Sequence, residues 1–184
     1  MESLPESDPR RDEALVEAAN EGDVSAFEVI YYRYRDWVVR LAYRFTGNKH
    51  DALDVLQDTF AYLLKKFPGF RLSAKMTTFL YPVVKHLSIA IQRKRRRYVS
   101  DDEIMREAAA PPEEDRPSRE ELAAVLAGLP EKQRDVLLMR FVDGMSLQEI
   151  AEAVRIPLGT VKSRPHNALQ TLRTDKRTRA YFLK

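Results

Sequence analysis

Acidic side chains recur along one predicted helix at residues 51 to 58. Asp51, Asp54 and Asp58, together with Gln57, follow one another at three- and four-residue spacing, which places them on one helix face. Paired carboxylates can serve as general acid and base, but no histidine, lysine or metal site accompanies these at a suitable spacing. An exposed acidic face suits a basic partner protein better. The pattern therefore predicts a face that is solvated or directed at a basic protein partner, rather than a catalytic site.

Five consecutive cations, Arg93 to Arg97, close a helix predicted from about Thr77 to Arg97. Such a run binds phosphates and gives affinity that depends on salt but not on base sequence. A solvated tail, or attraction to the negative end of the helix dipole, would explain the same residues. We favour polyanion binding. Pro82 falls early in this helix, where it removes a backbone donor and can kink the axis.

A helix-turn-helix is predicted from residue 145 onward. Ser146 and Glu149 form a capping box ahead of apolar residues at helical spacing, and Pro157 ends this helix and begins the next. The second helix carries hydroxyl and cationic side chains that suit phosphates and base edges. The plainer alternative is an amphipathic helix pair in any small helical domain.

The composition limits the class of protein. The 184 residues are 44% hydrophobic and 32% charged, with a formal net charge of +3 and no cysteine. No apolar run could span a bilayer and no signal peptide is recognisable, so we expect a cytoplasmic protein without membrane insertion. The three histidines, His50, His86 and His166, are scattered. We therefore expect no metal and no other cofactor.

The remaining pattern is helical throughout and predicts an all-α fold of two small domains on a tether. Residues 1–11 are polar and expected to fray, residues 99–118 form an acidic linker, and residues 177–184 form a tail. The linker could instead mimic nucleic acid and occupy a basic channel of a partner. The helical domains span residues 12–98 and 119–176. Further helices are expected at residues 13–20, 25–45, 50–66 and 131–141, the last with Pro130 at its first position.

Three expectations concern apolar side chains. The aromatic residues of the second helix, including Trp37, are assigned to the core rather than to a stacking platform. In the third helix Leu53, Leu56, Phe60 and one of Leu63 and Leu64 are expected to face inward. The loop that follows, from Phe67 to Lys75, is expected to expose Phe70 as a contact residue.

Residues 26–97 and 119–173 resemble regions two and four of the extracytoplasmic-function sigma factors, compact members of the sigma-70 family. Asp51-x-x-Asp54-x-x-Gln57-Asp58-x-Phe60 resembles the helix with which that family docks onto RNA polymerase. The run from Leu129 to Arg140, then Glu149-Ile-Ala and Gly159-Thr-Val-Lys-Ser-Arg164, resembles region four. Both motifs in this order make the resemblance specific.

The resemblance implies a promoter-specific initiation factor that is not itself an enzyme. Its partners would be the clamp coiled coil and flap of core RNA polymerase, promoter DNA and, as a further candidate, an anti-sigma factor. The implied polymerase-binding residues are Asp51, Asp54, Gln57, Asp58 and Phe60. The implied minus-ten residues, which capture a flipped base or hold phosphates, are Phe70, Arg71, Lys75, Phe79, His86, Arg93, Arg95, Arg96 and Arg97. The implied minus-thirty-five residues are Thr160, Lys162, Ser163, Arg164, His166, Asn167 and Arg173.

The chain departs from the family pattern at several of these places. Phe79, His86 and Ala90 stand where the family usually has Trp, Asn and Asp, so the resemblance does not specify the promoter sequence. Arg155 takes a turn position usually given to glycine, which costs about 1 kcal/mol if that residue is left-handed. Pro165 and Asn167 replace an apolar residue and an arginine, and a proline inside a helix can cost about 3 kcal/mol.

Two other classes of protein would account for part of this sequence pattern. A stand-alone helix-turn-helix regulator would bind duplex DNA by itself, and it would leave the acidic helix and the Phe70 loop without a purpose. An enzyme acting on nucleic acid is disfavoured, because no residues combine a nucleophile, a base and an orienting group.

Overall fold

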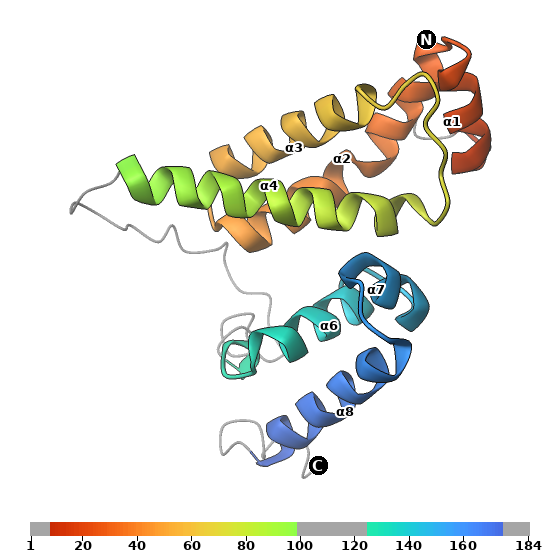
Figure 1. The fold of residues 1–184 in the computed structure, drawn as a ribbon. Coiled ribbons are helices and arrows are strands. Elements are labelled where there is room, and N and C mark those ends of the chain that lie inside the picture. Colours follow the sequence, from red (N-terminus) through yellow and green to blue (C-terminus); the bar gives the residue numbers. More distant parts are fainter. Residues whose placement is uncertain (1–7, 99–124, 175–184) are drawn as a thin grey trace, which may run out of the picture. The chain divides into compact units, whose positions relative to one another are not determined.

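The computed structural model describes residues 8–98 and 125–174, and every regular element within them is a helix (Figure 1). These helices fall into two compact units, with α1 to α4 in the first and α6 to α8 in the second. The sequence predictions for residues 1–7, for the acidic linker and for the tail lie outside the described residues.

The first unit begins with α1, Asp12–Asn20, and α2, Val24–Thr46. A tight turn joins them at Gly22, whose positive φ of 95° is readily adopted only by glycine. Asp23 then caps α2, because its carboxylate accepts hydrogen bonds from the amides of Ser25 and Ala26 at 2.9 and 3.2 Å. The long helix predicted for residues 25–45 is present within one residue at each end.

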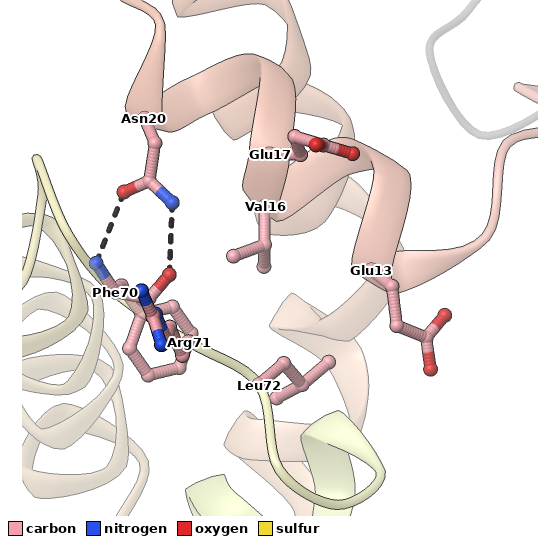
Figure 2. A pocket seen from close by; sticks show the side chains of 7 residues that line it. All are labelled: Glu13, Val16, Glu17, Asn20, Phe70, Arg71 and Leu72. Carbon is pink, nitrogen blue, oxygen red and sulfur yellow. Dashed lines mark hydrogen bonds between the residues drawn. The ribbon is translucent and has the colours of Figure 1, made fainter.

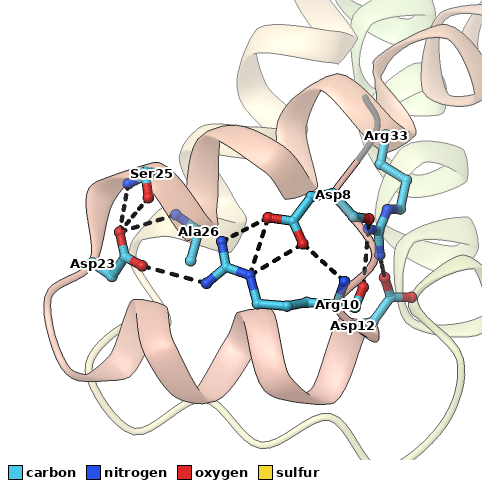
Figure 3. Close-up of polar contacts among 7 residues, drawn as sticks. All are labelled: Asp8, Arg10, Asp12, Asp23, Ser25, Ala26 and Arg33. Atoms are coloured by element: carbon cyan, nitrogen blue, oxygen red, sulfur yellow. Dashed lines mark hydrogen bonds and ion pairs between the residues drawn. The ribbon is translucent and has the colours of Figure 1, made fainter. Parts of the chain in front are cut away.

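Polar contacts tie the residues before α1 onto α2 (Figure 3). Arg33 of α2 pairs with Asp12 at 2.7 Å and also donates to the backbone carbonyls of Asp8 and Arg10, each at 3.0 Å. Arg10 in turn pairs with Asp8 at 2.8 Å and holds the pKa of that carboxyl below its usual value. Residues 8 to 11, which we expected to fray, are therefore tied to α2 by hydrogen bonds from Arg33, which lies more than twenty residues further along the chain.

The core of the first unit lies where α2 packs against α3, Lys49–Leu64, and α4, Met76–Tyr98. Its largest fully buried side chains include Ile30, Val38, Leu41, Val55, Leu63, Leu80 and Tyr81. The second-helix aromatics sit at its edge rather than inside it, since Tyr31, Tyr34 and Trp37 are half-buried. Burial and a hydrogen bond to Asp12 raise the pKa of the Tyr34 hydroxyl, which therefore stays protonated and donates to that carboxylate.

One leucine of α3 was predicted on the wrong side of the helix. Leu53 is 39% exposed, whereas Leu56, Phe60 and Leu63 are buried as expected, and Leu64 is the exposed member of its pair. The inward face instead follows Ala52, Val55, Thr59 and Leu63, at three- and four-residue spacing. Leu53 lies one residue, or about 100°, beyond this face. Alanine and threonine occupy positions on the buried side, so a pattern built on the largest apolar residues misses them.

The second unit comprises α6, Glu131–Phe141, α7, Leu147–Val154, and α8, Leu158–Thr174. Val125, Leu129, Leu137, Ala168 and Leu172 form a core cluster in which α8 closes against α6 and the segment before it. The predicted limits of α6 are confirmed, although Pro130 is its N-cap rather than its first helical residue.

The helix-turn-helix consists of α7 and α8. The predicted capping box is present, since the Glu149 amide donates to the Ser146 hydroxyl at 3.2 Å and the Ser146 amide donates to the Glu149 carboxylate at 2.7 Å. Arg155 ends α7 in the left-handed conformation, with φ 53° and ψ 50°, and so carries the strain that glycine would avoid. α8 runs on through Pro165 without ending there.

Candidate docking and nucleic-acid interfaces

The acidic face of α3 is mostly open to solvent. Asp54, Gln57 and Asp58 are exposed, and Leu53 adds an exposed apolar side chain directly before Asp54 in the sequence. Asp51 differs, because its side chain is 19% exposed and pairs with Arg95 of α4 at 3.4 Å. A partly exposed ion pair of this kind contributes little stability. It joins Asp51, which was assigned to polymerase binding, to Arg95, which was assigned to the minus-ten DNA.

Phe60 cannot contact a partner directly. It is 5% exposed, and its ring meets those of Phe27 and Tyr31 at centroid distances of 6.4 and 4.8 Å. Phe60 therefore anchors the buried side of α3 to α2, while Asp54, Gln57 and Asp58 face outward. A hydrophobic residue two positions after Asp58 falls on the opposite side of the helix from the acidic face, which accounts for its burial.

The loop between α3 and α4 is clamped by Asn20, the last residue of α1 (Figure 2). The Asn20 side-chain oxygen accepts from the amides of Gly69 and Phe70 at 2.7 and 3.0 Å, and its amide nitrogen donates to the Phe70 carbonyl at 2.8 Å. The backbone at Phe70 is thus paired on both sides. Sequence reasoning missed Asn20, because nothing local marks a contact fifty residues away.

Phe70 is buried, contrary to the expectation that this loop exposes it. The residue is 8% exposed and its ring lies against Phe67 and Phe79, at centroid distances of 5.6 and 4.8 Å. Arg71, the next residue, is exposed, and so is Lys75. Beside this cluster the half-buried Phe79 stacks on Tyr62 of α3, at 6.4 Å and an interplanar angle of 22°. Tyr62 is 40% exposed and was not among the predicted site residues.

An exposed ridge continues along α4 from Phe79. Pro82, His86, Ala90 and Arg93 follow at three- and four-residue spacing, and each is exposed. At 1.5 Å per residue, Phe79 and Arg93 lie about 20 Å apart along the helix axis. Arg95 is exposed next to the end of the ridge, whereas the side chains of Arg96 and Arg97 lie outside the described residues. The ridge joins an aromatic end to a cationic end.

The predicted DNA-reading residues of α8 mostly face solvent. Val161, Ala168 and Leu172 hold the helix against its unit, which turns Ser163, His166 and Gln170 directly outward. Lys162 and Arg173 flank this face on one side, and Thr160 and Asn167 flank it on the other, all four exposed. Arg164 is half-buried. Gln170 was not predicted, although its seven-residue spacing from Ser163 would have placed it there.

Two negative findings apply to residues 8–98 and 125–174. No helix in these ranges is long and apolar enough to cross a membrane. No cluster of three or more histidine, aspartate or glutamate side chains in them is arranged to hold a metal ion.

The fold and these surfaces define a two-unit helical DNA-binding protein, with a helix-turn-helix in one unit and an acidic face beside an aromatic and basic ridge in the other. Residues 30–98 match the family model of Sigma-70 region 2, and residues 119–172 match that of Sigma-70, region 4. The chain belongs to the extracytoplasmic-function (ECF) sigma factors of the sigma-70 family, and its function is to direct promoter-specific transcription initiation.

Curated relatives agree with this assignment. The chain is 32% identical over 177 residues to the ECF RNA polymerase sigma factor SigW of Bacillus subtilis, covering 88% of this chain and 95% of SigW. It is 30% identical over 181 residues to the ECF sigma-E factor of Salmonella typhimurium, covering 90% and 94%.

Two solved structures share the fold. The sigma factor RpoE of Bartonella quintana, crystallised with the anti-sigma factor NepR, matches with a TM-score of 0.64 at 20% identity over 82% of this chain and 96% of that one. CnrH, solved with the cytosolic domain of CnrY, matches with a TM-score of 0.63 at 19% identity over 93% and 96%.

Proposed function

We propose that this sigma factor divides its contacts among three surfaces. The outer face of α3 docks on the clamp coiled coil of core RNA polymerase, the ridge on α4 holds the melted minus-ten element, and α8 reads the minus-thirty-five element in the major groove. The observation that carries the proposal is that Asp54, Gln57 and Asp58 are exposed together on one helix, while the ridge lies on another helix of the same unit.

The chemistry of each surface supports its assignment. Carboxylates on a solvated helix suit a basic protein surface, and cations at the end of α4 suit phosphates. On α8, Lys162 and Asn167 can make hydrogen bonds to base edges in the major groove, whereas Thr160 and Arg173 suit phosphates.

The same proposal includes the domains, the linker and further partners. Residues 12–98 and 119–176 act as regions two and four, residues 99–118 tether them, and the polymerase flap is a further contact. The protein works in the cytoplasm without a cofactor and catalyses no reaction itself. Because RpoE and CnrH were solved with NepR and CnrY, we include an anti-sigma factor among the candidate partners of this chain.

The docking assignment is tested by the double variant Asp54→Ala and Gln57→Ala. Both side chains are exposed, so the fold should persist, while affinity for core polymerase should fall on the order of tenfold or more. The measurement is titration of the labelled chain with core enzyme. Glu28→Ala removes an exposed acid from α2 and serves as the control. Unchanged affinity in the double variant would remove α3 from the docking surface.

The reading helix is tested by Lys162→Ala with Asn167→Ala. Loss of a good base contact costs about 1–3 kcal/mol of discrimination, so preference among minus-thirty-five sequences should relax while polymerase affinity stays constant. A base-substitution scan of the promoter measures this preference. Lys132→Ala on α6 removes an exposed cation of the same unit and should leave the preference intact. A scan that does not change in the double variant would contradict the assignment.

A further inference from the structure

We propose that Tyr62, in the last turn of α3, stacks on an unpaired base of the melted promoter strand. This inference rests on the proposed function of the first unit. It assigns the stacking contact with a melted base to Tyr62 instead of Phe70. The ligand is single-stranded DNA, and the contact is between the tyrosine ring and the face of one base.

Of the side chains that the resemblance assigned to base capture, Phe70 is not accessible and Phe79 is half-buried, while His86 is exposed. Phe70 is 8% exposed, its ring lies between those of Phe67 and Phe79, and Asn20 pairs its backbone on both sides. A base could reach Phe70 only by opening this cluster. Tyr62 is 40% exposed, and a base that stacks on it has to displace only the side chain of Lys66, whose ammonium lies over the tyrosine ring.

Tyr62 is already one member of a stack. Its ring lies nearly parallel to that of Phe79, with an interplanar angle of 22° and a centroid distance of 6.4 Å, and Phe79 rests in turn on Phe70. The buried Phe70 and the half-buried Phe79 support the platform, and Tyr62 is its outermost ring. A base that lies on Tyr62 would extend the series. Base–aromatic stacking tolerates any base, because every base has a π face.

The charge along the outer face of α3 changes sign at Tyr62. Asp54 and Asp58 precede it, whereas Lys65 and Lys66 follow it, and all four are exposed. The Lys66 ammonium lies 4.6 Å from the centroid of the Tyr62 ring. Phosphates on either side of a stacked base would therefore meet cations at this end of the helix, and the carboxylates would repel them from the other end. The acidic half is left for the protein partner.

The α4 ridge gives the strand a continuous path. From Phe79, against which Tyr62 rests, exposed residues lead through His86 to Arg93, over about 20 Å of helix. A strand with one base on Tyr62 can thus cross an exposed imidazole and bring its phosphates to the cations at the end of α4. Such a combination of stacking rings and cations along one surface is typical of single-strand binding.

The inference is tested in polymerase holoenzyme assembled with the full chain, on a promoter mapped with the wild-type protein. Fluorescence of 2-aminopurine in the minus-ten non-template strand reports opening. Tyr62→Ala should lower the equilibrium constant for opening about five- to a hundredfold, the range expected for loss of one stacked base. Tyr62→Phe keeps the ring and should stay close to wild type. Tyr43→Ala removes a tyrosine of α2 that is also 40% exposed, and should have no effect.

The outcomes distinguish a failure of the proposed function from a failure of the stacking role of Tyr62. Wild-type chain that starts no RNA at discrete sites would overturn the proposed function itself. Wild-type activity together with equal opening by Tyr62→Ala and Tyr43→Ala would overturn only the stacking role. A Tyr62→Phe defect as large as that of Tyr62→Ala would show that the hydroxyl acts rather than the ring. Loss of core binding by Tyr62→Ala would assign the residue to the docking face instead.

A photochemical experiment gives an independent answer. Holoenzyme bound to a promoter with 5-iodouracil in the minus-ten non-template strand should, after irradiation, yield an adduct on the peptide that contains Tyr62. The adduct should be lost in Tyr62→Ala and retained in Tyr43→Ala. An adduct on Phe70 in place of Tyr62 would show that the buried cluster opens, and would contradict the proposal.

Discussion

At the scale of single residues, the most consequential side chain of the first unit is Asn20. Its three hydrogen bonds fix the loop that carries Phe70, and through Phe70 they fix the position of Phe79. Asn20→Ala leaves these backbone groups without a protein partner and should lower the free energy of unfolding by about 1–3 kcal/mol. Trp37 is the only tryptophan of the chain, so its fluorescence during urea unfolding follows this unit alone.

Asn20→Asp is the graded control. The carboxylate can still accept from the amides of Gly69 and Phe70, but it cannot donate to the Phe70 carbonyl, so its loss of stability should be intermediate. Promoter opening should fall in the same order as stability, while affinity for core polymerase stays constant. If Asn20→Ala unfolds at the wild-type urea concentration, the clamp does not hold the loop in solution.

At the scale of elements, local sequence predicted where helices begin and end, but not always which side they bury. The limits of α2 and α6 and the capping box of α7 follow from short-range signals such as the Ser146 and Glu149 pair. The burial of Phe70 and the exposure of Leu53 depend on neighbours distant in the chain, which spacing alone does not reveal. Family resemblance indicated α3 as the candidate docking helix, and only the structure separated its outward residues from Phe60.

Pro165 is expected to lower the stability of one element, the helix α8, by a measurable amount. It lies inside α8, where it has no amide to donate to the Val161 carbonyl, and an interior proline costs about 3 kcal/mol in an ordinary helix. Pro165→Ala should raise the unfolding free energy of the second unit by about 1–3 kcal/mol. Far-ultraviolet circular dichroism follows the helices of both units, so the part of its transition that Trp37 fluorescence does not share reports the second unit. Pro157→Ala, just before the helix, should change stability far less. Equal effects of the two substitutions would show that the structure around Pro165 already compensates for its cost.

At the scale of the whole molecule, the small net charge of +3 is the sum of acidic and basic surfaces that lie on different parts of its helices. Carboxylates gather on one half of α3, whereas cations gather at the ends of α3 and α4 and along α8. Each unit has its own buried core, so substitutions on the surface of one should not disturb the fold of the other. Salt dependence and base preference should therefore separate experimentally, because phosphate contacts carry the first and base contacts the second.

Arg93→Gln with Lys94→Gln tests this separation while leaving the pair between Asp51 and Arg95 intact. Each lost phosphate contact should lower the slope of log affinity against log salt by about 0.7–0.9, so the double variant should lower it by roughly 1 to 2 without altering base preference. Lys162→Ala should relax base preference as well as weaken binding. Because the two sites belong to different units, combining them should add their free-energy costs to within about 0.5 kcal/mol. Promoter binding by holoenzyme over a series of salt concentrations measures all three quantities. A larger coupling would mean that the two units engage DNA as one surface, and the separate assignments of α4 and α8 would have to be abandoned.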